Sequence, residues 1–263
     1  MDIATLNQNY YNLCLTYNLN DPNIMRKFIH GLQTGDTCFS IANSLSFSAE
    51  DRKFIYAVGL LHDVGRMEQW KRYSSFSDTK GKPHEELATL VLKNQISKFF
   101  ETKKQQSLAI KLIKNHTKYY FGKDKDIIKF LPVLKNADSY ANLEYNATGM
   151  QRLWVNQDGI TENVLYKFQN RENLHGTKIY TKLDRILQFL SRAYLIEFNL
   201  LKRDMLARKY LNAIYEEYSK FLNEPDKQIL FNEVWRLKQE LAAQVELHDK
   251  LKKEAIESGE KCV

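Results

Sequence analysis

The sequence contains little of what a fold outside the all-α class requires. Among its 263 residues there are only 10 glycines and 4 prolines, too few for an all-β architecture, in which tight turns recur throughout the chain. Hydrophobic residues make up 43% of the chain and aromatic residues 12%. A core of considerable size can therefore form, and a disordered chain is excluded. We expect an all-α protein.

The sequence also lacks the patterns typical of disulfide-bonded proteins and of membrane-spanning segments. The three cysteines, Cys14, Cys38 and Cys262, include no Cys-x-x-Cys pair, and an odd number fits free thiols in a reducing compartment. The N-terminal stretch lacks the basic and apolar regions of a signal peptide. No apolar run approaches the roughly 18 residues that a membrane-spanning helix needs. These absences predict a cytoplasmic protein with no membrane partner.

Positive charge is concentrated in one part of the chain. The net charge is +7. Residues 98–135 hold ten lysines and only three acidic residues, so the whole excess lies in this stretch. A solvated helical face is the usual meaning of such a run. Near a binding site it could instead steer an anionic substrate. The sequence leaves both interpretations open.

The stretch GLLHDVGRMEQW, residues 59–70, contains the adjacent pair His62–Asp63 at the end of an apolar run. The run, residues 54–61, predicts a buried helix that delivers both side chains to the interior. Burying an imidazole and a carboxylate is costly without a partner, and a divalent metal ion is one such partner. A plain helix end capped by Gly65 is the alternative.

The remaining histidines strengthen the metal interpretation. Four of the six histidines and two aspartates follow one another in the order His30, His62–Asp63, His84, His116 and Asp138. This order, with the flanking stretches RKFIHGLQTG, LLHDVGR, KPHEELATLVL, IKNH and NADSYANLE, resembles the HD-domain superfamily of metal-dependent phosphohydrolases. A longer similarity, from about residue 20 to 222, is to a bacterial family with an LLHD-GR-EQ…Y-F-D motif, matched here by Arg66, Glu68, Gln69, Tyr73, Phe76 and Asp78.

The resemblance implies a fold and a ligand set. It implies an HD-type helical bundle with additional C-terminal helices, which we place in an HD domain over residues 1–225 and a helical extension over residues 226–263. By the same resemblance, two divalent ions (Mn, Fe, Co, Ni, Zn or Mg) are expected. The first would be held by His30, His62, Asp63 and Asp138, and the second by His84, His116 and the shared Asp63.

Such a centre predicts the hydrolysis of a phosphoric ester. Two ions about 3.5–4 Å apart clamp a phosphoryl group and generate hydroxide near neutral pH. We expect a phosphomonoesterase or phosphodiesterase with a phosphorylated small molecule, nucleotide-like, as substrate; nucleic acid is not favoured. Asp63, His62 and Arg66 are the predicted catalytic residues. Contacts to substrate are predicted from position for Arg66, Gln69, Lys82, Lys114 and Lys118.

Two other functions use the same residues. Some HD-domain proteins are mixed-valent di-iron oxygenases with this ligand order, and a non-catalytic nucleotide-binding module would keep a vestigial site. The basic surroundings favour phosphate chemistry over oxygenation, and the complete ligand set disfavours a vestigial site. The Gly-Tyr-Pro signature of cyclic-di-GMP hydrolases and the partner domain of ppGpp synthetases are both missing, which argues against those two activities.

The segments between and beyond the ligands give further expectations. Residues 66–83 read as a loop with a short helix, residues 180–201 as one amphipathic helix, and His175 as a surface residue. In the last segment the apolar positions are close to a heptad pattern, at Leu230, Val234, Leu237, Leu241, Val245 and Leu251. This helix either packs back on its own domain or forms a homodimer contact.

Overall fold

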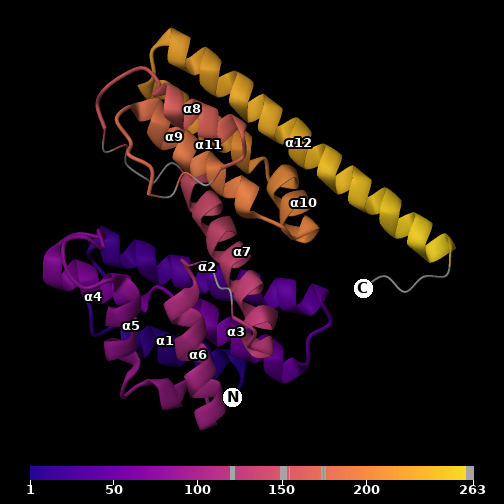
Figure 1. The fold of residues 1–263 in the computed structure, drawn as a ribbon. Coiled ribbons are helices and arrows are strands. Elements are labelled where there is room, and N and C mark those ends of the chain that lie inside the picture. The colour runs from indigo at the N-terminus through magenta and orange to yellow at the C-terminus, as the bar shows by residue number, and fades with distance from the viewer. Residues whose placement is uncertain (119–121, 149–152, 154, 173, 175, 259–263) are drawn as a thin grey trace. The chain divides into compact units, whose positions relative to one another are not determined.

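The computed structural model describes all residues except 119–121, 149–152, 154, 173, 175 and 259–263 (Figure 1). Among the residues described, the secondary structure consists of α-helices, short 3₁₀ helices and turns, and no strand occurs. The predicted all-α class is confirmed. His175, expected at the surface, lies outside the described residues.

The chain divides into two compact units, residues 1–141 and 142–263, and the division falls inside helix α7 (Lys125–Ala147). The domain boundary that we predicted at residues 225/226 does not coincide with this division. It falls in the first turn of α12 (Glu224–Glu257), within the second unit. The extent of the hydrolase domain toward residue 225 stays a prediction.

The first unit consists of the indigo to magenta helices of Figure 1. Its helices before α7 are α1 (Ile3–Cys14), α2 (Pro22–Ser44), α3 (Ala49–Leu61), α4 (Val64–Tyr73), α5 (His84–Leu92) and α6 (Lys103–Asn115), with a 3₁₀ turn at Ile96–Lys98.

Helix starts in the first unit follow from local sequence. The side chains of Asp2, Asp21 and Ser48 each accept a hydrogen bond from a backbone N–H of the following first turn. At α6, Thr102 and Gln105 form a reciprocal capping box. Such caps satisfy N–H groups that have no partner inside the helix, at about 1 kcal/mol each.

Two glycines allow the helices that carry the predicted ligands to approach closely. A Cβ added at Gly59 of α3 would lie 2.9 Å from the Cα of Gly35 in α2. A Cβ added at Gly65 of α4 would lie 1.9 Å from the carbonyl oxygen of His84 in α5. Both distances are far below a normal contact, so only glycine permits the pairs α2–α3 and α4–α5 to pack as they do.

The segment after the His62–Asp63 pair agrees only in part with the expected loop and short helix. Residues 64–73 form the regular helix α4, and only residues 74–83 are a loop. The helix had no clear apolar period because Val64, Gly65, Met67 and Gln69 are all buried, so its buried face contains a polar residue. Ser74, with a positive φ of 48°, ends the helix.

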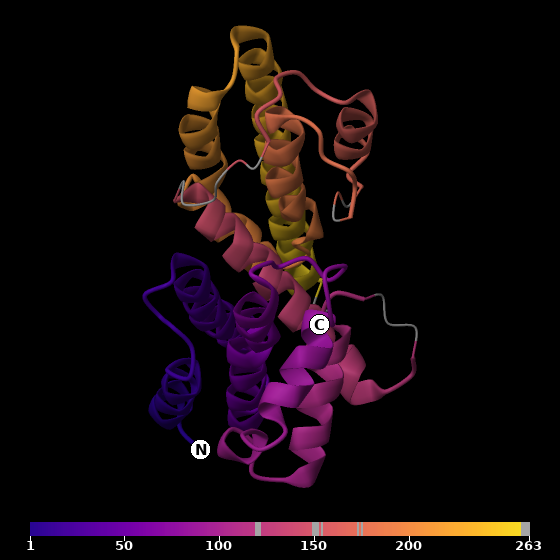
Figure 2. The same cartoon turned by 90° about the vertical axis from the view of Figure 1, so that its left-hand side faces the viewer.

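The second unit contains α8 (Glu162–Gln169), α9 (Lys182–Leu190), α10 (Asn199–Ala207), α11 (Tyr210–Tyr218) and α12, with 3₁₀ turns at Ser191–Leu195 and Ser219–Phe221. The single helix predicted over residues 180–201 is wrong, because the 3₁₀ turn separates α9 from α10. Figure 2 shows α12, in yellow, running beside the orange α9.

Helix α12 packs on its own unit over its first part. Leu230, Val234, Leu237 and Leu241 are buried, which agrees with the interpretation that this helix packs back. Leu247 and Leu251 are 57% and 56% exposed. A homodimer contact through this second part stays a prediction. Every helix of the described residues is too short or too polar to cross a membrane.

Candidate metal centre

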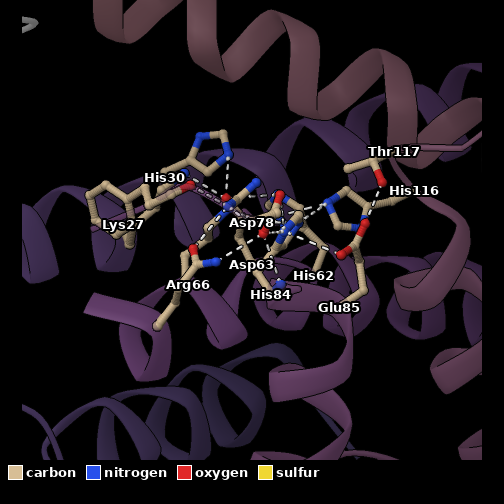
Figure 3. Close-up of polar contacts among 12 residues, drawn as sticks. Lys27, His30, His62, Asp63, Arg66, Asp78, His84, Glu85, His116 and Thr117 are labelled. Atoms are coloured by element: carbon tan, nitrogen blue, oxygen red, sulfur yellow. Dashed lines mark hydrogen bonds and ion pairs between the residues drawn. The ribbon is translucent and has the colours of Figure 1, made fainter. Parts of the chain in front are cut away.

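The predicted ligands converge in the first unit, and Figure 3 labels His30, His62, Asp63, His84 and His116 among them. His30 lies within α2, His62 follows the last residue of α3, Asp63 precedes α4, His84 begins α5, His116 follows α6, and Asp138 lies within α7. The four histidines are between 0% and 5% exposed, and Asp63 is 7% exposed. The side chain of Asp138 is 21% exposed. Residues that are up to 108 positions apart in the chain thus meet in one cluster.

Asp63 stands between two groups of histidines, and its two oxygens face different groups. Oδ2 lies 3.8 Å from His30 Nε2 and 4.0 Å from His62 Nε2. Oδ1 lies 3.6 Å from His84 Nε2 and 3.8 Å from His116 Nε2. The trios His30–His62–Asp63 and Asp63–His84–His116 can each hold a metal ion. This is the arrangement expected of a carboxylate that bridges two ions.

Asp138 joins the first of these groups. Its Oδ1 lies 3.0 Å from His30 Nε2 and 3.6 Å from His62 Nε2. The carboxylate interrupts the apolar stripe of α7, where Leu134 and Ala141 are completely buried. The contacts with His30 and His62 account for a carboxylate among these apolar residues.

Hydrogen bonds fix the orientation of three imidazole rings. Nδ1 of His62 lies 2.8 Å from the carbonyl oxygen of Gly59, and Nδ1 of His116 lies 2.6 Å from that of Ile113. Nδ1 of His84 lies 3.0 Å from Asp78 Oδ1. An Nδ1–H that donates to such an acceptor leaves Nε2 unprotonated and directed at the centre, as in histidine ligands of metal ions.

The chemistry of the centre fits a divalent ion. His62 Nε2 is completely buried and has no hydrogen-bond partner among the residues that the structure describes. His84 Nε2 and His116 Nε2 lie 3.4 Å apart. With metal–nitrogen distances of about 2.1 Å, two ligands of one ion are separated by roughly 3–3.4 Å. A bound ion would give His62 Nε2 the partner that it lacks, and a second ion would fit between the nitrogens of His84 and His116.

Electrostatics favour neutral rings at His30 and His116 and ionised carboxylates at Asp63 and Asp138. Burial lowers the pKa of His30 and of His116 to about 4. Burial alone would raise the pKa of Asp63, but the charge of Lys27, followed by those of the histidines and Arg66, holds it well below the usual value. Burial disfavours a charged His62 as well, yet Asp63 and Asp138 outweigh this and raise its pKa. The cluster therefore attracts positive charge.

A polar network beside the centre supports His84. Asp78 Oδ1 accepts hydrogen bonds from the backbone N–H of His84 at 3.0 Å, from Arg66 Nη1 at 3.0 Å and from Gln69 Nε2 at 2.9 Å. Arg66 Nη1 also donates to Gln69 Oε1 and to the carbonyl oxygen of Phe76. The network ties the loop of residues 74–83 to α4 and fixes the ring of His84.

This network changes the interpretation of one predicted residue. Gln69 was predicted to contact substrate, but it is 0% exposed and its amide is engaged by Arg66 and Asp78. It supports Asp78 rather than facing solvent. Arg66, predicted as catalytic, has its Nε 3.8 Å from Asp63 Oδ1, so it lies beside the centre.

Three side chains that the sequence reasoning did not include belong to the same cluster. Lys27 Nζ lies 2.6 Å from Asp63 Oδ2. Glu85 is buried, with Oε2 3.3 Å from His84 Nδ1 and Oε1 accepting from the Thr117 hydroxyl. Lys27 precedes His30 by three residues in α2 and therefore shares its helical face, which was the available signal.

The predicted lysines lie at the surface. Lys82, Lys114 and Lys118 are exposed. Of their polar atoms, the backbone carbonyl oxygen of Lys82 accepts from Gln69 Nε2 at 3.5 Å, and that of Lys118 accepts from Lys135 Nζ. The roles of these lysines toward a substrate stay predictions.

Comparison with known proteins agrees with this site. The family model for the HD domain matches residues 28–143, a range that contains all six predicted ligands. Searches of curated proteins and of solved structures found no match. HD domains bind divalent metals, and the clusters of this site can hold them. Residues 28–143 of the chain are therefore similar to the HD domain.

Proposed function

We propose that this protein is a metal-dependent phosphohydrolase that cleaves a phosphomonoester or phosphodiester of a small, nucleotide-like molecule. The observation that carries the proposal is the position of Asp63, whose two oxygens each face a separate pair of histidine Nε2 atoms. A single structural ion would need one such group, whereas hydrolysis of phosphate esters commonly uses two ions sharing a carboxylate.

The residues divide the work as follows. His30, His62, Asp63 and Asp138 would hold one divalent ion, and Asp63, His84 and His116 the other. Bound there, divalent ions lower the pKa of water toward neutrality and stabilise charge on a phosphoryl group. Asp78 and the carbonyl oxygens of Gly59 and Ile113 hold the rings in place. Arg66, Lys82, Lys114 and Lys118 are the proposed contacts to phosphate.

Metal analysis and a substrate screen test the proposal. Protein purified without chelator is analysed for metal content and then assayed on phosphomonoesters and phosphodiesters with Mn²⁺, Co²⁺, Ni²⁺, Mg²⁺ and Fe²⁺. We expect close to two ions per chain and phosphate release that depends on the added metal. Iron content with oxygen uptake and no phosphate release would instead indicate a di-iron oxygenase. Nucleotide binding without either reaction would indicate a non-catalytic module.

A further inference from the structure

Lys27 occupies an unusual place for a lysine. Its side chain is only 12% exposed, and its ammonium nitrogen lies 2.6 Å from Asp63 Oδ2. This is the oxygen that faces His30 and His62 at 3.8 and 4.0 Å. The ammonium therefore sits on the side of Asp63 where the proposed function places the first ion.

An ion on the first group and the ammonium in this position repel each other strongly. An ion bonded to Asp63 Oδ2 at about 2.1 Å lies at most about 4.7 Å from Lys27 Nζ, given the 2.6 Å contact. Like charges at this distance interact strongly where little water screens them. Both cations also compete for the same carboxylate oxygen. An ion in the first group would therefore favour departure of Lys27 from Asp63.

The surroundings offer the displaced side chain a place beside the centre. Already in its contact with Asp63, Lys27 Nζ lies 5.8 Å from the centroid of the Phe76 ring, so this ring is next to the ammonium when it leaves the carboxylate. A lysine side chain has a flexible four-carbon stem, so its ammonium can turn from Asp63 toward an anion without movement of α2. A phosphate bound to the two ions would be the nearest new anion.

Resting on the proposed function, we propose that Lys27 is a displaceable counter-ion of the centre. In the metal-free protein its ammonium neutralises the buried Asp63. When a divalent ion binds the first group, Lys27 leaves Asp63 and binds an oxygen of the substrate phosphate. Lys27 accordingly weakens metal binding and strengthens phosphate binding, two effects of opposite sign that a merely structural lysine would not have.

Three variants of the full chain test this role. Lys27→Met removes the charge and keeps the length of the side chain. Lys27→Arg keeps the charge. Lys93→Met removes a charge from the same unit at an exposed side chain outside residues 98–135, and serves as the matched control. Each protein is stripped with chelator, and its affinity for Mn²⁺ is measured by calorimetry and by the EPR signal of free Mn²⁺.

We expect Lys27→Met to bind the first Mn²⁺ about tenfold or more tightly than wild type, because a neighbouring positive charge is gone. Affinity for inorganic phosphate, titrated into the Mn²⁺-loaded protein, should fall about tenfold in the same variant, since a charged hydrogen bond is lost. Lys27→Arg and Lys93→Met should resemble wild type in both measurements. Unchanged or weaker Mn²⁺ binding by Lys27→Met overturns the proposal, and so does unchanged phosphate binding.

Thermal melting provides a second readout that does not depend on a fully folded metal-free variant. Lys27→Met leaves Asp63 buried without its partner, which destabilises the metal-free protein. A ligand that binds only the folded state raises the melting temperature, so Mn²⁺ should raise that of Lys27→Met more than that of wild type. An equal or smaller rise contradicts the proposal. If wild type binds no Mn²⁺, the proposed function itself is overturned. If wild type binds Mn²⁺ and hydrolyses phosphoesters, the proposed function holds, and a failure of the Lys27 variants then counts against the role of Lys27 alone.

Discussion

At the scale of single residues, the buried charges of the centre depend on one another. Asp63 is surrounded by the ammonium of Lys27, the guanidinium of Arg66 and imidazoles on both sides. A buried carboxylate is stable only when its charge is compensated. Substitutions here consequently change stability and metal binding together, and the predictions must separate the two.

Asp63→Asn is expected to abolish binding of both ions, because the shared ligand loses its charge. Phosphohydrolase activity should fall by at least about a hundredfold. The metal-free protein should lose about 3–5 kcal/mol of stability, since Lys27 is left buried without its anion. Metal analysis and denaturant unfolding measure the two effects.

A matched control is Asp51→Asn, which removes the partner of Lys129 at a surface pair. It should cost no more than about 1 kcal/mol and leave metal content unchanged. Full metal occupancy in Asp63→Asn would contradict the assignment of Asp63 as a bridging ligand.

Asp78→Asn tests the support of His84. The amide accepts hydrogen bonds less strongly than the carboxylate, and it leaves the charge of Arg66 without its close partner. We expect the ion bound by His84 and His116 to be held about 10–100-fold more weakly, as is typical when the partner of a ligand histidine is lost. Binding of the first ion should change little. Measured by titration with Mn²⁺, weakening of both ions to the same degree would mean that Asp78 acts on the whole fold.

At the scale of secondary-structure elements, helix ends and close helix contacts set the positions of the ligands. His62 and Asp63 lie in the short break between α3 and α4, and His84 and His116 lie at the start of α5 and the end of α6. At a helix end the backbone departs from the helical path, so successive side chains can take different directions. The Asp63 carboxylate can therefore face both groups of histidines, whereas His62 belongs only to the group that contains His30.

The close contacts of Gly59 and Gly65 predict that alanine at each position displaces a different histidine of the centre. Gly59→Ala should force α3 away from α2 and move His62 from His30, because its Cβ would meet Gly35 and Thr34 at 2.9–3.0 Å. Gly65→Ala should force α4 away from α5 and move His84, whose carbonyl oxygen lies 1.9 Å from the new Cβ. Each should lower the free energy of unfolding by about 1–3 kcal/mol or more.

Titration with Mn²⁺ distinguishes the two glycine variants. Gly59→Ala is expected to weaken mainly the first ion, and Gly65→Ala mainly the second. If both variants melt at lower temperature but bind two ions as wild type does, the helix contacts stabilise the fold without setting the geometry of the centre.

At the scale of the whole molecule, the uneven distribution of charge is the feature most relevant to a phosphorylated substrate. Residues 98–135 contain the whole excess of positive charge. Some of these lysines form ion pairs, such as Lys111 with Asp124 and Lys129 with Asp51. Lys114 and Lys118 are exposed on either side of His116 in the sequence. These two are the best placed to attract an anion.

Ionic strength tests the steering. If the lysines collect substrate, kcat/KM should fall several-fold between about 0.05 and 0.5 M salt, because the Debye length shrinks from about 14 Å to about 4 Å. The value of kcat should change little. Lys114→Glu and Lys118→Glu should flatten the salt dependence strongly, and charge reversal at Lys103 and Lys104 should flatten it slightly. A flat profile in wild type would show that the lysines form an ordinary solvated face.

The sequence by itself predicted the helical class, the similarity to the HD domain and six candidate ligands, which the structure brings close together. Scarcity of glycine and proline disfavours sheets, and side-chain types with the chemistry of metal ligands are rare enough to be recognised by order alone. The helix that ends at His62 could also be placed, because residues 54–61 are apolar and Ser48 offers a cap.

Only the tertiary structure decided how these residues meet and what surrounds them. Helices from different parts of the chain come together at the centre. Their packing directs the two Asp63 oxygens to different histidines, brings Lys27 to Asp63 and buries Gln69. A lysine or a glutamine in a sequence reads as a surface residue, since its burial is rare without a partner. Those partners, Asp63 for Lys27 and Asp78 for Gln69, lie 36 and 9 residues away. Close packing of α2 on α3 and of α4 on α5 is the physical reason that they meet.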